Sequence, residues 1–256
     1  MERFADRRVL ITGAGSGIGR ATVHRILSEG GTVVGADVND AGLAETRQQA
    51  AEQGRADRLS TVVIDISDED SVRAGVGTAL ETLGGLDALI NAAGILRSAH
   101  THEMPLADWN RIITTNLTGT FLMVRESLPA LLESGRGVIV NFASTSTYFA
   151  HPYMAAYAAS KGGIMSMTHA LAVEYGKQGL RAVAVAPGSI SSDMTDGRGP
   201  GLPEDADFTL FTKLVPLLGQ GFAAPETVAG VVAMLASDDG AFITGTEVRI
   251  DGGTHA

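Results

Sequence analysis

Cysteine is absent from all 256 residues of the sequence. Its absence excludes disulfides, thiolate nucleophiles, iron–sulfur clusters and thiolate zinc sites. Basic residues are also scarce, because 19 lysines and arginines stand against 29 acidic residues and leave a net charge of −10. A chain with this balance and no basic run is a poor partner for nucleic acid.

Long apolar runs are missing as well. The longest uncharged segment, residues 137–160, contains Asn141, His151 and many hydroxyl groups, which do not suit a bilayer. The N-terminal segment carries Glu2, Asp6 and three arginines, so it does not have the pattern of a signal peptide. Hydrophobic residues nevertheless make up 45% of the chain, enough for a large core. We therefore expect a soluble, cytoplasmic, globular protein.

Short apolar, β-branched runs alternate with longer helix-like segments almost from end to end. Runs that are apolar throughout are typical of strands covered on both faces, and their alternation with helices predicts a doubly wound parallel sheet. We expect one α/β domain over residues 1–256, with helices on both faces of the sheet. The expected strands are Val9–Thr12, Thr32–Asp37, Ser60–Asp65, Ala88–Asn91, Gly137–Phe142, Arg181–Ala186 and Glu247–Ile250. The expected helices include Ile18–Ser28, Leu43–Gln53, Glu69–Leu83, Leu106–Leu132 and Met154–Gly176.

Residues 191–224 interrupt this alternation. They contain three prolines, several glycines and the apolar patch FTLFTKLVPLLGQGF at 208–222. A stretch of this length inside a compact α/β domain is typical of a lid or binding loop, and a surface excursion with one short helix is the alternative. The apolar content favours a lid over a binding site.

A glycine-rich turn, TGAGSGIG at residues 12–19, follows the first expected strand and opens a helix. Gly13, Gly17 and Gly19 have G-x-x-x-G-x-G spacing, and glycine lets the backbone approach a pyrophosphate at a helix N-terminus. A purely structural turn could carry the same glycines. Asp37, however, ends the second strand 18 residues beyond Gly19, close to where an acid meets the adenosine ribose hydroxyls. Together these features favour dinucleotide binding.

Tyr157 is followed four residues later by Lys161 in the sequence YAASK. On a helix these two side chains share a face, and an ammonium near a phenol lowers the phenol pKa because it favours the phenolate. Such a tyrosine can exchange a proton with a substrate oxygen. A solvent-exposed helix pair is the alternative interpretation.

Ser144 and Asn116 are two further candidates. Ser144 lies just past the fifth expected strand, at the carboxyl edge where α/β proteins bind ligands, although it could be an ordinary turn serine. Asn116 lies within an expected helix, where asparagine is unfavourable unless its side chain or the freed backbone has a task.

The joint arrangement resembles the classical short-chain dehydrogenase/reductase family, from Val9 to Gly253. The resemblance implies a Rossmann-type fold and a catalytic tetrad of Asn116, Ser144, Tyr157 and Lys161. The sequence NAAG at 91–94 resembles the family motif NNAG, with Ala92 in place of the second asparagine. Other matches are Asp65-Ile66 beside adenine, Pro187-Gly188 under the nicotinamide, Ser192 in place of the usual threonine, and DGG at 251–253. The cofactor-binding residues implied in this way are Gly13, Ser16, Gly17, Ile18, Gly19, Asp37, Asp65, Ile66, Asn91, Ala92, Gly94, Tyr157, Lys161, Pro187, Gly188, Ile190 and Ser192.

The resemblance also implies a role for each member of the tetrad. Ser144 would hydrogen-bond the substrate oxygen, and Tyr157 would pass the proton. Lys161 would lower the phenol pKa and bind the nicotinamide ribose, and Asn116 would hold a water that links Lys161 to solvent. The hydride would move between the substrate carbon and the nicotinamide, so no metal is needed. The closely spaced histidines, His100 and His102, have few further ligand candidates nearby, and we expect no metal site there.

We therefore expect an NAD-dependent oxidoreductase that acts on a secondary alcohol or its ketone. A 2′-phosphate requires a basic side chain near residues 16 and 37–38, and the chain offers Ser16, Asp37 and Val38. The alternatives are an NADPH-dependent ketone or 3-oxoacyl reductase and a non-catalytic NAD-binding regulatory protein. The presence of all four tetrad residues argues against the second alternative.

The substrate itself is not readable from the sequence. Phe149, His151, Met154 and the apolar patch suggest a pocket that is neither strongly charged nor small, in which Lys213 could pair with an anion. Steroids, cyclic alcohols, terpenoid alcohols and hydroxyacyl compounds all remain open.

The helix-like segments 106–132 and 154–176 carry more apolar residues than one sheet face needs. In the family that the chain resembles, these segments pair across a two-fold axis. We expect a homotetramer, with a dimer as the next possibility and a monomer with well-buried helices as the plainest alternative.

Overall fold

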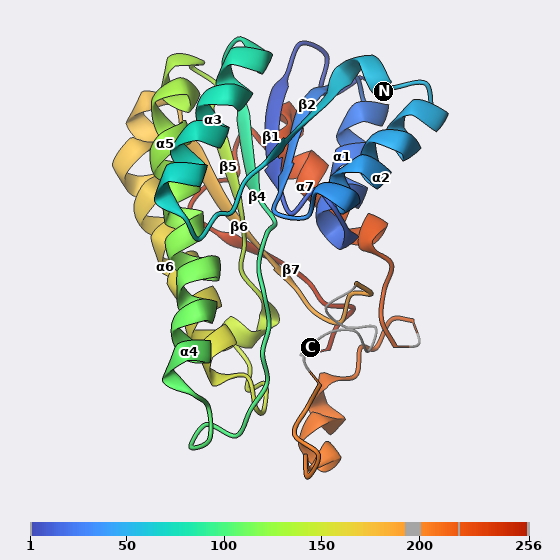
Figure 1. The fold of residues 1–256 in the computed structure, drawn as a ribbon, viewed down its shortest axis with the longest axis vertical. Coiled ribbons are helices and arrows are strands. Elements are labelled where there is room, and N and C mark those ends of the chain that lie inside the picture. The colour runs from blue at the N-terminus through green and yellow to red at the C-terminus, as the bar shows by residue number, and fades with distance from the viewer. Residues whose placement is uncertain (1, 193–200, 220, 255–256) are drawn as a thin grey trace.

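The computed structural model describes residues 2–192, 201–219 and 221–254 (Figure 1). In this part of the chain a seven-stranded parallel sheet has the order β3-β2-β1-β4-β5-β6-β7. Each expected strand is present, with ends that differ by at most two residues from the prediction. The strands are β1 Arg8–Thr12, β2 Thr32–Asp37, β3 Leu59–Val63, β4 Ala88–Asn91, β5 Val138–Phe142, β6 Arg181–Pro187 and β7 Glu247–Ile250.

Helices cover both faces of the sheet, because alternate residues of each strand point to opposite sides. Val9 and Ile11 of β1 belong to a core that α1 and α7 cover, whereas Leu10 between them belongs to a second core under α3 and α5. Figure 1 shows the two helical layers on either side of the sheet. The helices are α1 Gly17–Ser28, α2 Asp40–Glu52, α3 Glu69–Leu83, α4 Leu106–Ile113, α5 Gly119–Glu133, α6 Ala155–Tyr175 and α7 Pro225–Ala236. The prediction of a single doubly wound α/β domain is confirmed.

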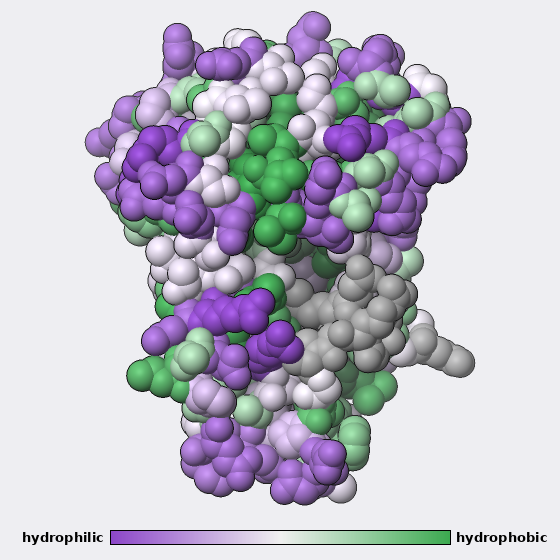
Figure 2. All heavy atoms as spheres, in the orientation of Figure 1, coloured by the Kyte–Doolittle hydropathy of each residue, from purple (hydrophilic) through white to green (hydrophobic). Residues whose placement is uncertain are grey.

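The strand order reverses direction between β1 and β4, which lie side by side in the centre of the sheet. In open α/β sheets, ligands bind outside the carboxyl ends of the strands at such a point. Thr12 and Asn91 are register partners at the carboxyl ends of β1 and β4, and the loops that follow them open the site. The space-filling view shows a recess between the upper and lower halves of the molecule (Figure 2).

The expected single helix over 106–132 is wrong in detail. The structure has α4, then a π-helical turn over Thr114–Thr118, then α5. A π turn accommodates an extra residue and is frequent at functional sites. Here it contains the buried Asn116, whose side chain hydrogen-bonds outside the helix. The polar task of this asparagine explains the interruption.

The chain that follows β6 leaves the sheet and returns to α7. Its two ends are joined by a parallel bridge between Ile190 and Ala223, and its described part contains the short 3-10 helix Phe208–Leu214. Residues 193–200 and 220 of the expected lid lie outside the described residues. In the described parts of the chain, no helix combines the length and the apolar character that a membrane crossing requires.

A buried acid lies at the opposite, amino edge of the sheet. Asp87, just before β4, is fully buried and accepts hydrogen bonds from Arg8 Nε at 2.9 Å and Arg136 Nε at 3.0 Å. Burial alone would raise the pKa of Asp87, but the hydrogen bonds from the two arginines outweigh it and hold the pKa well below the usual range. This ion cluster ties β1, β4 and β5 together away from the site.

Candidate active site

The glycine-rich turn lies against the acid at the end of β2. Gly15 N donates to Asp37 Oδ2 at 2.9 Å, and Asn39 N donates to Oδ1 at 2.9 Å. A Cβ at Gly15 would come within 2.9 Å of Asp37 Oδ2, so a side chain there would displace the carboxylate. Gly13 and Gly17 have φ of +71° and +51°, which L side chains rarely adopt. A cradle of bare backbone beside a fixed acid fits a dinucleotide with free ribose hydroxyls.

Gly19 has a packing role in the same turn. A Cβ at Gly19 would lie 1.9 Å from Gly13 O, so the first turn of α1 packs directly on the loop. The predicted cofactor residues Ser16 and Ile18 are partly exposed there, and Ile18 also packs against the core under α1. Helix α1 therefore begins at Gly17 with its N-terminus toward the cradle, where an anionic pyrophosphate is favoured.

The NAAG segment meets the glycine-rich turn across the centre of the sheet. A Cβ at Gly13 would lie 2.8 Å from Ala93 N and 2.9 Å from the Ala92 carbonyl carbon. Asn91 is buried and donates from Nδ2 to Asn141 Oδ1 at 2.9 Å. A Cβ at Gly94 would lie 3.4 Å from Lys161 Nζ. The four residues thus connect the turn with the predicted catalytic lysine.

The turn after β6 closes the site from the other side. Gly188 N donates to Ile250 O at 3.0 Å, and a Cβ at Gly188 would lie 2.8 Å from Asp251 Cβ. Two residues further on, the buried Ile190 begins the segment that leads to α7. A Cβ at Gly17 would lie 3.4 Å from Ser192 Cβ, so Ser192 lies against the glycine-rich turn. Pro187 O accepts from Thr145 Oγ1 at 3.4 Å, so the end of β6 lies beside the segment that begins with Ser144.

Asp65 and Ile66 lie farther out, in the loop after β3. The Asp65 side chain accepts from Ser67 N at 2.9 Å and from Ser67 Oγ at 2.6 Å, which fixes the turn before α3. Ile66 is buried in the core under α3 and α5, and a Cβ at Gly119 would lie 2.7 Å from Ile66 O. The exposed Asp65 is available to a ligand, whereas the Ile66 side chain serves the core.

Ser144, Tyr157 and Lys161 come together beneath the carboxyl end of β5. Ser144 is 6% exposed and precedes a short 3-10 helix, where its Oγ accepts from Ser146 N at 3.1 Å. Tyr157 and Lys161 lie one turn apart on α6, with Lys161 Nζ 5.6 Å from the centre of the Tyr157 ring. Lys161 Nζ also donates to Phe142 O at 2.7 Å, so the last residue of β5 fixes the ammonium.

The expected lowering of the Tyr157 pKa is not found in the structure. Burial raises the pKa of Tyr157, and the hydrogen bond with Ser144 opposes this shift without cancelling it. Burial also lowers the pKa of Lys161 to about 8, because its charged form loses solvation. The helical spacing brings the two groups together, but burial is the largest influence on the pKa of each.

Asn116 connects the π turn with two other parts of the site. Its Oδ1 accepts from Ile95 N at 2.8 Å, and its Nδ2 donates to Ile95 O at 2.9 Å. The same Nδ2 lies 3.1 Å from Ser160 Oγ, which donates to Tyr157 O at 2.7 Å. Asn116 is fully buried and therefore fixes the loop after NAAG against the helix that carries Tyr157.

Several residues at the site were not among those predicted. Ser160 links Asn116 to the Tyr157 backbone, Gly15 donates to Asp37, and Thr168 accepts from Asn141 Nδ2 at 2.9 Å. Gly15 lies inside the glycine-rich motif and Ser160 inside YAASK, so the sequence could have identified both as site residues. Thr168 lies seven residues beyond Lys161 on the same helical face, which only becomes informative once α6 is known to be buried.

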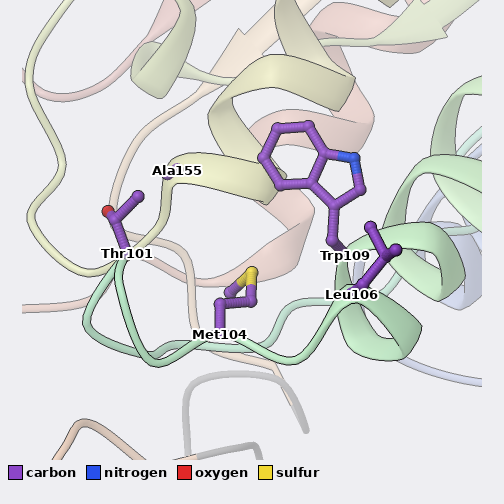
Figure 3. A pocket seen from close by; sticks show the side chains of 5 residues that line it. All are labelled: Thr101, Met104, Leu106, Trp109 and Ala155. Carbon is purple, nitrogen blue, oxygen red and sulfur yellow. The ribbon is translucent and has the colours of Figure 1, made fainter.

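A pocket of about 220 Å³ opens at the foot of α6 (Figure 3). Met104 and Trp109 point into it from the segment between β4 and α4 and from α4 itself, and Thr101, Leu106 and Ala155 complete the lining. Ala155 starts the helix that carries Tyr157, so this apolar pocket lies near the predicted proton-transfer residue. Among the described residues, no group of three or more histidines, aspartates and glutamates is arranged to hold a metal ion.

Comparisons with known proteins agree with this geometry. The family model "Enoyl-(Acyl carrier protein) reductase" matches residues 13–255. The chain is 36% identical over 251 residues to the 3-oxoacyl-[acyl-carrier-protein] reductase FabG of Thermotoga maritima, covering 98% of both proteins. It is 38% identical over 258 residues to a levodione reductase of Leifsonia aquatica, with 99% of this chain and 96% of that protein covered.

Solved structures show the same likeness in three dimensions. The crystal structure of carveol dehydrogenase from Mycobacterium avium in complex with NAD superposes with a TM-score of 0.88 at 28% identity, over 99% of both chains. With the parallel sheet, the glycine-rich turn and the Ser-Tyr-Lys cluster in place, these matches settle the class. The chain belongs to the classical short-chain dehydrogenase/reductase family. Its relatives are dehydrogenases and reductases, and an oxidoreductase activity on alcohols or ketones follows from that membership.

Proposed function

We propose that the protein transfers a hydride between NAD and a secondary alcohol or its ketone. The observation that carries this proposal is the meeting of Ser144, Tyr157 and Lys161 within reach of the loops that follow β1 and β4. NAD, when bound, supplies the hydride acceptor or donor. The chain's own residues would bind and orient the substrate and move one proton.

The roles of the tetrad follow from its contacts. Ser144 and Tyr157 share a hydrogen bond, so a substrate oxygen between them would accept from both hydroxyls during ketone reduction. The raised pKa of Tyr157 keeps the phenol protonated at neutral pH, which suits proton donation to a ketone. In the oxidation direction the phenolate must accept the alcohol proton, and the ammonium of Lys161 would stabilise that phenolate. Asn116 would hold the loop and helix in register.

The dinucleotide would lie along the predicted cofactor residues. Gly13, Gly15 and Gly17 offer bare backbone for the pyrophosphate, and the Asp37 carboxylate would accept from the ribose hydroxyls. Lys161 would donate to the second ribose. The NAD complex of the carveol dehydrogenase neighbour supports this choice of cofactor.

An NADPH-dependent reduction of 3-oxoacyl groups is the second candidate. It is favoured by the relative named as a 3-oxoacyl-[acyl-carrier-protein] reductase at 36% identity. The position of Asp37 argues against it, because its carboxylate would face the 2′-phosphate of NADP.

One panel of assays tests both candidates. The purified protein is given NAD or NADP with secondary alcohols, and the reduced cofactors with the matching ketones and a 3-oxoacyl thioester. Tyr157→Phe serves as the catalytically impaired control. Tyr157-dependent turnover with NAD and an alcohol or ketone supports the proposal, whereas turnover confined to NADPH and the thioester supports the second candidate. Turnover that is equal in the Tyr157→Phe variant contradicts both.

A further inference from the structure

Tyr153 has an unusual backbone conformation at the mouth of the site. It lies in the loop between β5 and α6, four residues before Tyr157, with φ of +66°. Among the described residues other than glycine, only Asp6 and Tyr153 have positive φ. Glycine would adopt this conformation freely, whereas a tyrosine is held in it only when its surroundings compensate. The contacts of Tyr153 therefore need an explanation.

Those contacts join three loops. The Tyr153 carbonyl accepts from Ala99 N at 2.9 Å, in the loop that follows β4. The Tyr153 hydroxyl accepts from Asp207 N at 2.8 Å, in the chain that follows β6. The Tyr153 ring stacks on Phe211 at 6.1 Å between centroids and meets His100 edge-on at 5.1 Å. One side chain thus connects the segments that follow the three neighbouring strands β4, β5 and β6, whose carboxyl ends border the site.

The residues that Tyr153 contacts on the β6 side belong to a largely exposed segment. In the segment 203–214, which we call the lid segment, the 3-10 helix has no buried residue, and Phe208 is 71% exposed. A second link is the pair between His100 Nε2 and Asp205 Oδ1 at 2.9 Å. The Asp205 side chain is 78% exposed, so solvent screens this ion pair and it contributes little. Tyr153 thus supplies a hydrogen bond and a ring contact that attach the lid segment to the opposite wall.

The far end of the same chain is fixed independently. Leu217 N and Leu218 N both donate to Gly252 O at 2.9 Å, and Ala223 N donates to Ser189 O at 2.9 Å. Loss of the Tyr153 contacts would therefore release the lid segment and leave its base in place. The effect on the fold should be small, because the sheet and both cores do not include this segment.

We propose that Tyr153 is a positioning residue that docks the lid segment across the mouth of the substrate site. It acts through Asp207 and Phe211, and it sets substrate affinity without taking part in proton transfer. The kinetic part of this inference rests on the proposed function, but the docking itself does not. The order of the lid segment can therefore be measured whether or not a substrate is known.

The experiment compares four variants with the unmodified chain by hydrogen exchange and by steady-state kinetics. Tyr153→Phe removes only the hydroxyl that accepts from Asp207, and Tyr153→Ala removes the ring as well. Tyr153→Gly also removes the ring but accommodates the positive φ, so it keeps the test valid if the alanine variant folds poorly. Tyr148→Phe is the matched control, since this tyrosine lies in the same loop and its hydroxyl bonds Glu247 on β7.

Protection of the amides of 205–211 should fall in Tyr153→Phe and fall further in the alanine and glycine variants. Loss of one neutral hydrogen bond should raise KM for the alcohol by about threefold to tenfold, and loss of the ring should raise it further, with kcat within about threefold. The affinity for NAD and all properties of Tyr148→Phe should stay unchanged. Equal protection of 205–211 in the glycine variant and the unmodified chain would overturn the inference. A fall in kcat with KM unchanged would overturn it too, since a lid anchor does not act on the chemical step.

If no alcohol or ketone is turned over by the unmodified chain, the proposed function fails while the hydrogen-exchange comparison still decides the role of Tyr153. If turnover is found but protection of 205–211 does not depend on Tyr153, the proposed function stands and the inference fails.

Discussion

Replacement of Asp37 tests the cofactor preference most directly, because the carboxylate is fixed where we propose that the adenosine ribose lies. Both of its oxygens accept backbone hydrogen bonds, from Gly15 N and Asn39 N, each at 2.9 Å. Arg20, which could have balanced this charge, donates to Gly15 O and pairs with Glu45 at 2.8 Å. The nearby arginine therefore already has an acidic partner of its own.

The magnitude follows from the charge that NADP would add. A 2′-phosphate carries about −1.5 to −2 at neutral pH. At 4 Å each unit pair repels by about 1 kcal/mol in water and about 4 kcal/mol at an effective dielectric of 20, and the partly exposed Asp37 lies between these limits. The phosphate also replaces a hydroxyl that would donate to the carboxylate, a charged hydrogen bond worth about 1.5–3 kcal/mol. A total of about 3 kcal/mol or more corresponds to a preference for NAD of at least about a hundredfold.

The assay is kcat/KM for NAD and NADP with one alcohol, in the unmodified chain and two variants. Asp37→Ala removes the repulsion, and the double change Asp37→Ala with Val38→Arg adds a cation at a position that is 66% exposed. The NAD-to-NADP ratio should fall by about tenfold or more in the first and by at least about a hundredfold in the second. Asp40→Ala is the control for net charge, since it removes an equal charge from the start of α2.

In Asp40→Ala the NAD-to-NADP ratio of kcat/KM should stay close to that of the unmodified chain. This result would show that the position of the removed charge matters, and not only the net charge. Equal or higher efficiency with NADP in the unmodified chain would refute the role given to Asp37.

Four further predictions follow from the structure. Tyr157→Phe should reduce turnover by about 10²–10⁴ and leave NAD binding nearly intact, and retention of more than about a tenth of the activity would exclude Tyr157 as the acid–base group. Because burial raises the Tyr157 pKa, alcohol oxidation should become more efficient as pH rises from about 7 to about 10, while ketone reduction should stay nearly constant over that range because the phenol remains protonated; pH-independent oxidation would contradict this. Asp87→Asn should destabilise the fold by about 3 kcal/mol, a decrease in Tm of about 6–12 °C, because it leaves Arg8 and Arg136 without their buried partner. Since the pKa of Asp87 is lowered in the folded chain, its contribution is present above the ordinary aspartate pKa and is lost as pH falls below about 4, so the Tm difference from Asp87→Asn should shrink in acid. Light scattering should show a homotetramer, and a mass near 26.5 kDa at micromolar concentration would refute this.

The sheet was predictable because its strands carry a strong local signal. Buried parallel strands are apolar throughout, and segments such as Val138–Phe142 and Arg181–Pro187 are buried along most of their length. Their ends were less predictable: Ser60–Asp65 was expected where β3 runs from Leu59 to Val63. The last residues of a strand are fixed by pairing with the neighbouring strand, which a single sequence does not display.

The candidate site was predictable where chemistry depends on short spacing and was missed where it depends on loops that meet only in the fold. The pair Tyr157 and Lys161 is set by one helical turn, so the sequence was sufficient to bring these groups together. The contacts of Tyr153 with Asp207 and Phe211 join positions more than fifty residues apart. Its positive φ leaves no mark in the sequence, because the residue type found there is not the one that this conformation favours.

The pKa of Tyr157 shows why correct neighbours do not guarantee the correct electrostatics. Sequence spacing placed an ammonium beside the phenol and thereby predicted a lowered pKa. In the fold, Lys161 is 4% exposed and donates to Phe142 O, and its own pKa falls to about 8. A lysine that is itself destabilised as a cation has less charge to offer at alkaline pH, while burial acts on the phenol in the opposite direction. Helical spacing therefore predicts that the two side chains meet, whereas the direction of the Tyr157 pKa shift depends on burial, which the spacing does not show.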